Sequence, residues 1–314
     1  MNPGDFMFKY TLDNKRYHTL NYYFKNKYGK KTFKVSLNAN FSCPNKEKTG
    51  HGCIFCSRLG SGDFAGDKEK DLITQFNEVK NIMEHKWPDS YYIGYFQANT
   101  NTYAPLDILK EKYESIINLP NVVGLNIATR SDAISEYCYD YLEELNKRTD
   151  LIIELGLQSI HEKTLRFINR GHDLKNFEQA VKELQKRHIP VVVHIINGLP
   201  GETKEDMLET VKYLNNLHID GIKIHMLHIT KDTDLEDYYK EHPFHVLTKE
   251  EYIDIVIDQL ELLDPKIVIH RITGDPKKED LIEPTWLLKK FCVLNDIDKE
   301  MVKRNTYQGK KKTN

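Results

Sequence analysis

Hydrophobic positions along this chain follow two alternating patterns. Short runs rich in β-branched and aromatic residues predict strands at 32–38, 91–97, 122–128, 151–157, 189–196 and 221–227. Between them, apolar residues recurring every three or four positions predict helices near 70–86, 105–118, 135–147, 173–188 and 203–217. In the fourth of these helices, Leu174, Phe177, Val181 and Leu184 have the spacing of one buried face. The chain is therefore expected to be an α/β protein.

Six strands separated by helices predict parallel pairing with right-handed crossovers. A doubly wound sheet and an open (β/α) barrel both fit this order. No linker rich in proline, glycine or serine interrupts the chain, so we expect one main domain at 32–230. A basic extension, 1–31, precedes it. Residues 231–314 form a C-terminal extension with a basic tail, predicted helices near 248–263 and 284–294, and a strand at 267–270.

Composition and charge narrow the class of protein. No run of eighteen apolar residues occurs, and no apolar segment follows the first charged residues, so we expect a cytoplasmic protein without a membrane span. The net charge is −2, yet residues 1–34 carry +6 and residues 289–314 carry +5. Basic ends on an acidic body suggest contact with a polyanion. The alternative is that the lysines at 310–312 form a solvated tail.

The strongest local signal is a cluster of cysteines directly after the first strand. Cys43, Cys53 and Cys56 have C-x9-C-x2-C spacing, which suits a soft metal or an iron–sulfur cluster. Structural zinc remains an alternative if His51 supplies a fourth ligand. A thioredoxin-like redox pair is a third reading, although it has no use for Cys43. Cys138 and Cys292 lie in predicted helices and are expected to be buried, small apolar residues.

The order of several motifs resembles one known family. Phe55 precedes the last cysteine, and GYFQANTNTYAP (94–105), TRSD (129–132), ELGLQS (154–159), INRGHD (168–173) and NGLPGET (197–203) follow in turn. Together they resemble the YhcC/YtqA-type bacterial radical S-adenosylmethionine (SAM) proteins, which are relatives of the Elongator catalytic subunit and of oxygen-independent coproporphyrinogen oxidase. The resemblance runs from about residue 34 to 227 and implies a partial (β/α)6 TIM-like barrel.

The resemblance also implies cofactors. The three cysteines would bind three irons of a 4Fe-4S cluster, and SAM would chelate the fourth iron. His51 would then not be a ligand, because it would occupy the SAM position. One electron from a flavodoxin- or ferredoxin-type donor would cleave SAM to a 5′-deoxyadenosyl radical. The residues implied to contact SAM are Phe55, Asn99, Thr100, Asn101, Thr102, Gln158, Arg170, Gly198 and Gly201. For Gly198 and Gly201, a purely conformational role in a strand-to-helix turn is equally open.

Two positions depart from the family pattern, since Ala128 and His194 stand where the relatives have acidic residues. His194 and, on the sixth strand, Lys223 and His225 are candidate catalytic residues. A Lys223 that faces the barrel interior would need the substrate or Glu154 as its partner, because an unpaired buried charge is costly. These side chains could equally belong to the core or to an outer face.

The resemblance implies transfer RNA (tRNA) as the substrate, with the wobble uridine converted from its 5-carboxymethylaminomethyl to its 5-aminomethyl form. The basic ends favour this independently, and the expected RNA contacts are Lys25, Lys27, Lys30, Lys31, Lys303 and Arg304. A radical SAM enzyme acting on a small metabolite or a protein is the first alternative. A non-catalytic zinc-binding scaffold is the second.

Overall fold

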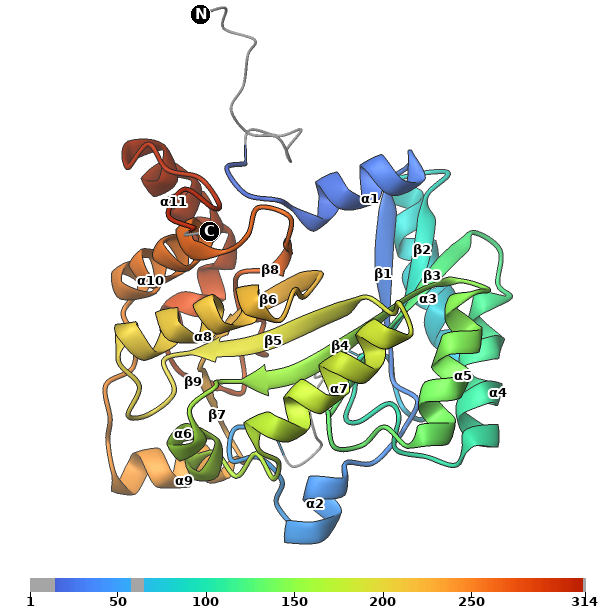
Figure 1. Cartoon of the computed structure of the whole chain (residues 1–314), viewed down its shortest axis with the longest axis horizontal. Coiled ribbons are helices and arrows are strands. Elements are labelled where there is room, and N and C mark those ends of the chain that lie inside the picture. Colours follow the sequence, from blue (N-terminus) through green and yellow to red (C-terminus); the bar gives the residue numbers. More distant parts are fainter. Residues whose placement is uncertain (1–14, 58–64, 313–314) are drawn as a thin grey trace, which may run out of the picture.

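Seven parallel strands form the centre of the computed structural model, which describes residues 15–57 and 65–312. Their order is β1-β2-β3-β4-β5-β6-β8, so each strand pairs with its neighbour in the chain until β6, which pairs with β8. The strands are β1 (Thr32–Leu37), β2 (Tyr91–Phe96), β3 (Val122–Thr129), β4 (Asp150–Gln158), β5 (Val191–Asn197), β6 (Gly221–Met226) and β8 (Val268–Arg271). The sheet curls into the partial barrel that the family resemblance implied (Figure 1).

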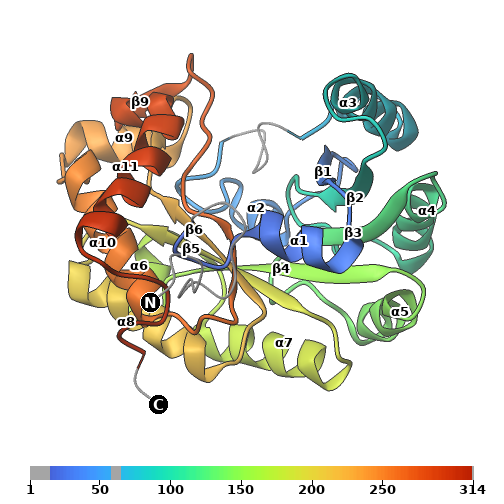
Figure 2. The same cartoon turned by 90° about the horizontal axis from the view of Figure 1, so that it is seen from above.

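Helices cover the outer side of this curved sheet, as Figure 2 shows from above. They are α3 (Leu72–Lys86), α4 (Leu106–Ile117), α5 (Glu136–Asn146), α7 (Leu174–Lys186), α8 (Lys204–Asn216) and α10 (Lys249–Leu262). Each begins and ends within a few residues of the helix that the hydrophobic spacing predicted. The faces they turn to the sheet are apolar, and Phe177, Val181 and Leu184 of α7 are fully buried. Thr203 and Asp206 form the capping box of α8.

Further elements lie around the ends of the barrel and, in the case of α11, against α10. They are α1 (Leu20–Tyr28), α2 (Pro44–Thr49), α6 (Glu162–Phe167), α9 (Asp234–Glu241), a 3-10 helix (Thr285–Lys289) and α11 (Lys290–Lys303). A two-stranded antiparallel ribbon pairs β7 (Ile229–Thr230) with β9 (Leu281–Glu283). In Figure 1, α1 lies where β1 begins, and α2 lies at the opposite end, where β1 has ended.

The C-terminal segment contributes more to the barrel than the sequence indicated. We expected a strand at 267–270, but not that it would extend the main sheet. Val268 and Ile269 pair with Gly221 and Ile222 of β6. The N-terminal segment reaches the same strand, because Thr19 forms an isolated parallel bridge with Ile269. Residues from both ends of the chain therefore close one side of the curved sheet. Among the described residues, no helix is long and apolar enough to cross a membrane.

Candidate active site

A cavity of about 330 Å³ opens at the end of the barrel where the parallel strands terminate. Cys43, Cys53 and Cys56 all line it. The loop after β1 brings them there through α2, which has Pro44 in its first turn and ends at Gly50 in the left-handed conformation. In a (β/α) barrel this end of the sheet carries the reactive groups.

The environment of Cys53 favours its thiolate. Hydrogen bonding from Cys56, together with the charges of Arg170 and Arg130, lowers the pKa of the Cys53 thiol despite its burial. The Arg170 Nη1–H group lies 3.8 Å from Cys53 Sγ, and the Asn45 amide nitrogen lies 3.7 Å from the same sulfur. Thiolates are the form of cysteine that binds metals, so these cations prepare the loop for a metal centre.

The spacing of the three thiols distinguishes between kinds of metal centre. Three sulfurs bound to one tetrahedral zinc ion lie about 3.8 Å apart, as follows from a Zn–S distance of about 2.3 Å. Within residues 15–57 and 65–312, the three cysteines are not among the groups whose ligand atoms all lie within 4.8 Å of one another. His51 is exposed, and its Nδ1 lies 3.4 Å from a carboxylate oxygen of Asp234. The three sulfurs are therefore not drawn together as the ligands of one zinc ion are, although Cys53 and Cys56 are hydrogen-bonded to each other.

Two buried guanidinium groups lie beside the thiols. Arg170 donates from Nη2 to the backbone carbonyl of Gly156, while its Nε–H has no hydrogen-bond partner among the described residues. Arg130 forms two hydrogen bonds of 2.8 Å with Asp132, and its Nη1 likewise has no partner. Both side chains, and that of Gln158, line the cavity. Unpaired buried donors next to a cavity indicate a site for an anionic or carbonyl-bearing ligand.

The loop after β2 divides into two pairs of residues. Asn99 and Thr100 line the cavity, as the resemblance implied. Asn101 and Thr102 are buried away from it. The Asn101 amide donates to the carbonyls of Phe96 and Ala128, and the Thr102 hydroxyl donates to another backbone carbonyl. The second pair therefore shapes the loop instead of facing a ligand.

Of the remaining residues implied to contact SAM, Phe55 lines the cavity and the two glycines do not. Gly198 and Gly201 both have φ values near +84°, a backbone conformation that glycine adopts without strain. A Cβ atom at Gly198 would lie 3.0 Å from a methyl group of Leu247. The structure thus gives these glycines a conformational role in the turn before α8.

A buried carboxylate occupies the interior of the barrel below the thiols. Glu154 of β4 is 0% exposed and accepts hydrogen bonds from Lys34 at 2.8 Å, Asn126 at 2.7 Å and the side chain of Lys223. The ring nitrogen Nε2 of His194 lies 2.8 Å from its second oxygen. Burial alone would raise the pKa of Glu154, but the charges of Lys223 and Lys34 lower it well below its usual value. Glu154 is therefore ionised, and Lys223 faces the interior with the partner that the sequence suggested.

The candidate catalytic residues lie together around this carboxylate. The rings of His194 and His225 are 5.5 Å apart, and both residues line the cavity with Lys223. Burial, with the charge of Lys223, lowers the pKa of His194 to about 4, and burial lowers that of His225 well below its usual value. Burial also lowers the pKa of Lys223 to about 7. At neutral pH the two rings are uncharged and Lys223 is close to its midpoint.

Sequence reasoning missed several residues of the cavity. Tyr95 accepts a hydrogen bond of 2.7 Å from Lys223, and Arg271 of β8 also lines the cavity. Lys34 reaches Glu154 from β1. Arg130 belongs to the TRSD motif, so the resemblance could have indicated its place in the site. The position of Arg271 follows from the pairing of β8 with β6, which no local pattern indicates.

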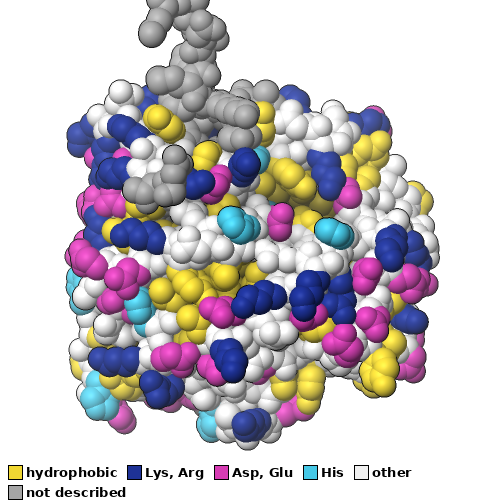
Figure 3. Space-filling model, viewed as in Figure 1, with side chains coloured by type: hydrophobic (Ala, Val, Ile, Leu, Met, Phe, Trp, Pro, Cys, Tyr) yellow, Lys and Arg dark blue, Asp and Glu magenta, His cyan; other side chains and the backbone are white. Residues whose placement is uncertain are grey.

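The basic helix α1 lies far from the cavity. It precedes β1, whereas the cysteines follow β1, and a strand of six residues spans about 20 Å. Lys27 and Lys30 also form ion pairs with Asp150 and Asp89, at 3.0 and 2.7 Å. On the face shown in Figure 3, basic and acidic side chains are interspersed. The expected contacts Lys25, Lys27, Lys30 and Lys31 therefore lie at the opposite end of the barrel from the thiols.

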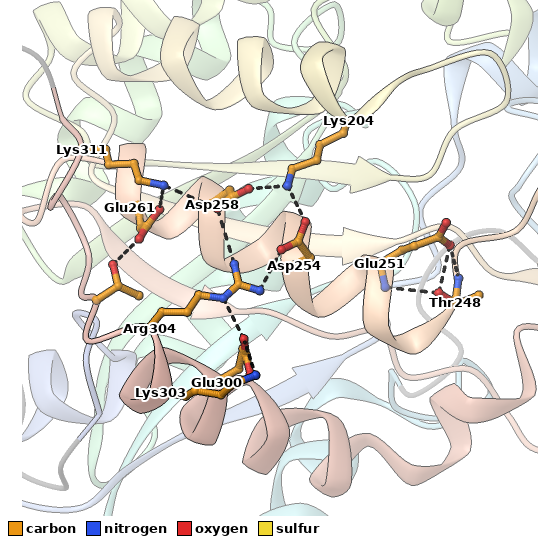
Figure 4. Close-up of polar contacts among 11 residues, drawn as sticks. Lys204, Thr248, Glu251, Asp254, Asp258, Glu261, Glu300, Lys303, Arg304 and Lys311 are labelled. Carbon is orange, nitrogen blue, oxygen red and sulfur yellow. Dashed lines mark hydrogen bonds and ion pairs between the residues drawn. The ribbon is translucent and has the colours of Figure 1, made fainter.

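At the C-terminus, Lys303 and Arg304 take part in a network of ion pairs within the protein (Figure 4). Arg304 lies 2.8 Å from Asp254, 3.7 Å from Asp258 and 3.0 Å from Glu300. Lys303 lies 3.2 Å from Glu300 as well. These carboxylates offset the positive charge that the sequence alone displayed, so Arg304 has a structural role joining α10 and α11.

The two remaining cysteines differ in exposure. Cys138 of α5 is buried, as expected, and burial raises the pKa of its thiol to about 12. The expectation for Cys292 was wrong, because this residue is exposed on α11. It lies next to Phe291, which is 71% exposed. This part of α11 therefore faces outward, and the apolar spacing there misled the prediction.

Comparison with known proteins agrees with this geometry. Residues 46–214 match the model of the radical SAM superfamily, and residues 219–303 match that of the Radical_SAM C-terminal domain. The chain belongs to the radical SAM superfamily. YtqA of Bacillus subtilis (strain 168) is 49% identical to it over 305 residues, which are 96% of this chain and 95% of YtqA.

More distant similarity extends to proteins of Methanocaldococcus infernus. Its tRNA uridine(34) acetyltransferase is 27% identical over 159 residues, covering 49% of this chain and 29% of that protein. The structure of its Elp3, which lacks residues 1–46, has a TM-score of 0.66 and 17% identity, covering 89% of this chain and 64% of that chain. The latter similarity shows a common fold and confirms the partial barrel.

The residues present fit the cofactors that the superfamily implies. Three thiols that line one cavity, are not drawn together around one ion and have Cys53 favoured as the thiolate suit a 4Fe-4S cluster. Arg170 and Arg130 hold unpaired donors beside them, which suits the carboxylate of SAM. Cys43, Cys53 and Cys56 would therefore hold the cluster, and Phe55, Gln158 and the two arginines would line the SAM site.

Proposed function

We propose that this protein is a radical SAM enzyme that modifies the side chain of the wobble uridine in tRNA. The proposed step converts a 5-carboxymethylaminomethyl group to a 5-aminomethyl group by breaking the bond between the amine nitrogen and the carboxymethyl carbon. The two-carbon unit would leave as glyoxylate, with water supplying its carbonyl oxygen and SAM, converted to methionine and 5′-deoxyadenosine, serving as the two-electron oxidant. The observation that carries the radical SAM part is the convergence of Cys43, Cys53 and Cys56 with Arg170 on one cavity. When bound, the cluster and SAM supply a one-electron cleavage that generates a 5′-deoxyadenosyl radical; an external flavodoxin- or ferredoxin-type protein would supply the electron.

Similarity to a tRNA uridine(34) acetyltransferase over half of this chain supports the choice of tRNA. The cavity opens at the end of the barrel where the strands terminate, so an extruded base would enter it from that end. Within it, the chain's own residues exclude water, orient the ligand and hold protons. The neutral rings of His194 and His225 and the amine of Lys223 are the groups placed to exchange a proton with the substrate.

RNA that inserts a base into this cavity must approach from the end where the strands terminate. Lys48 of α2 and Lys163 and Arg166 of α6 are exposed there, and Lys46 lines the cavity. We therefore place the RNA contact on α2 and α6, and not on α1 or α11. The K46E/K48E double variant should bind tRNA more weakly and lower the salt slope of binding by about two. K25E, at the other end of the barrel, is the matched control and should leave both unchanged.

The decisive test is anaerobic incubation of the reconstituted protein with SAM, a reductant and bulk RNA from a strain that lacks it. We expect 5′-deoxyadenosine to form and 5-aminomethyluridine to appear in the nucleoside profile. If 5′-deoxyadenosine forms while the RNA nucleosides stay unchanged, the substrate is a metabolite or a protein instead. If metal analysis of the anaerobic protein gives zinc and no iron, the protein is a scaffold and the proposal fails.

A further inference from the structure

Positive charge exceeds negative charge in the barrel interior. Arg271 lies near enough to Lys34 and Lys223 for its charge to add to the burial that lowers the pKa of both lysines, and the carboxylate among the three is Glu154. The side chains of Lys34 and Lys223 are 14% and 7% exposed. Asp275 lies 3.8 Å from Arg271, but Lys290 binds both of its oxygens, at 2.6 and 2.8 Å. Among the described residues, the interior therefore has an excess of cations over carboxylates.

The other polar groups facing this interior do not offset the excess. His194, His225 and His270 have lowered pKa values because they are buried, so they are uncharged at neutral pH. Burial and the charge of Glu154 raise the pKa of Tyr95 well above its usual value, so its hydroxyl is neutral as well. Buried charge without a counter-charge is costly, and a bound anion would relieve it.

We propose that the floor of the cavity is a carboxylate-binding subsite, in which Lys223 and Arg271 hold the carboxylate of the substrate's side chain. Both residues line the same cavity as the three cysteines. The side chain of Arg271 is 38% exposed and its ion pair with Asp275 is long, at 3.8 Å, so two of its N–H groups can engage a carboxylate side by side. The identity of the substrate rests on the function proposed above, in which the uridine side chain ends in a carboxymethyl group.

The depth of the subsite favours a slender carboxylate over a backbone phosphate. Lys223 is 7% exposed and Glu154 is 0% exposed, so a ligand must reach past the thiols and the SAM site to meet them. The end of a uridine side chain can do this, whereas a phosphate flanked by two riboses is too bulky. The neutral ring of His225, which lines the cavity without a hydrogen bond from the described residues, can accept the N–H of the amine in the same side chain.

The first experiment tests the subsite without RNA. The reconstituted protein, saturated with SAM so that the SAM site is filled, is melted with increasing glycolate or glycolamide at constant ionic strength. Glycolamide is the uncharged analogue of equal size. We expect glycolate to raise the melting temperature by roughly 2 °C and glycolamide to have no effect. The shift should disappear in Arg271→Gln and Lys223→Met. It should persist in Arg148→Gln, a control whose side chain is 39% exposed and also ion-paired.

Equal shifts with glycolate and glycolamide, or the same glycolate shift in the wild type and both subsite variants, would overturn the subsite.

The second experiment compares anticodon stem-loops whose uridine carries either the carboxymethylaminomethyl group or its terminal amide. We expect the wild type to bind the carboxylate form about tenfold more tightly and Arg271→Gln to lose this preference. If the glycolate shift is present but the two RNAs bind equally, the subsite stands and the uridine substrate is wrong.

Discussion

Replacing Glu154 by glutamine tests whether one carboxylate holds the barrel interior together. The substitution keeps the shape of the side chain and removes its charge. It leaves the ammonium groups of Lys34 and Lys223 buried without the carboxylate that accepts hydrogen bonds from both. Removing one partner of a buried ion pair costs about 3–5 kcal/mol. Two lysines share this carboxylate, but Lys223 can release its proton, which keeps the total within that range.

Replacing the lysine partner instead, by Lys223→Met, should lower the free energy of unfolding much less. Glu154 then keeps Lys34 at 2.8 Å, Asn126 at 2.7 Å and His194 at 2.8 Å. Methionine restores most of the buried volume, and the desolvation that lowers the pKa of Lys223 to about 7 no longer opposes folding. We expect a loss below about 1 kcal/mol. Glu114→Gln, which removes a surface carboxylate that is 38% exposed, should also cost under about 1 kcal/mol.

The assay is equilibrium urea unfolding of the full chain before cluster reconstitution, at matched pH and with the m-value checked for constancy. When folding lowers the pKa of a lysine, the protein loses stability as the pH falls from the pKa of that lysine in the unfolded chain, near 10.4, towards its pKa in the folded protein. In the wild type this loss from Lys223 ends near pH 7. Without Glu154 the folded pKa is lower still, so the loss continues below pH 7. Glu154→Gln should therefore be more destabilising at pH 6 than at pH 8.5. If Glu154→Gln costs no more than Lys223→Met at either pH, Glu154 does not hold the lysines as described.

Three further outcomes are expected. With the cluster in place, Cys292 should react with a maleimide within minutes while Cys138 stays protected; labelling that persists at full extent in Cys292→Ala would contradict this exposure. Arg170→Lys should weaken SAM binding roughly tenfold or more, measured by calorimetry, because an ammonium group cannot reproduce the planar pair of donors of a guanidinium. An affinity for SAM equal to that of the wild type would show that this geometry is unimportant. Arg304→Glu should lower the urea midpoint by placing a fourth carboxylate beside Asp254, Asp258 and Glu300, and an unchanged midpoint would refute the structural role of Arg304.

The hydrophobic pattern along the sequence was sufficient to predict the part of the barrel in which strands and helices follow one another as consecutive strand–helix units. Each predicted strand and helix up to 217 lies within a few residues of its observed position, because every unit buries an apolar face against its neighbour in sequence. The cysteine loop was also evident, since thiol spacing is a local property. The helix α2 inside that loop and the short α6 were missed, because each has only six residues and little apolar spacing.

The properties that sequence could not supply depend on contacts between distant segments. The basic ends suggested an RNA surface, yet Arg304 meets Asp254 and Lys27 meets Asp150, so pairing between segments offsets charges that look excessive locally. Arg271 reaches the cavity only because β8 joins the sheet beside β6. Residue types and spacing are therefore enough to identify a metal-binding loop. The excess of positive charge in the barrel interior depends instead on which strands lie side by side in the sheet.

Strand β4 explains how the two halves of the site are coupled. Glu154, Gly156 and Gln158 all line the cavity, Gln158 after a register irregularity that follows Gly156 in the pairing with β5. Glu154 lies among the lysines of the floor, the Gly156 carbonyl holds Arg170 beside the thiols, and Gln158 lines the cavity at the end of the strand. A Cβ atom at residue 156 would lie 2.9 Å from the Arg170 guanidinium, so the glycine leaves room for it. One strand thus fixes the depth of the anion-binding floor relative to the cofactor residues, and a substrate arm of defined length can span the two.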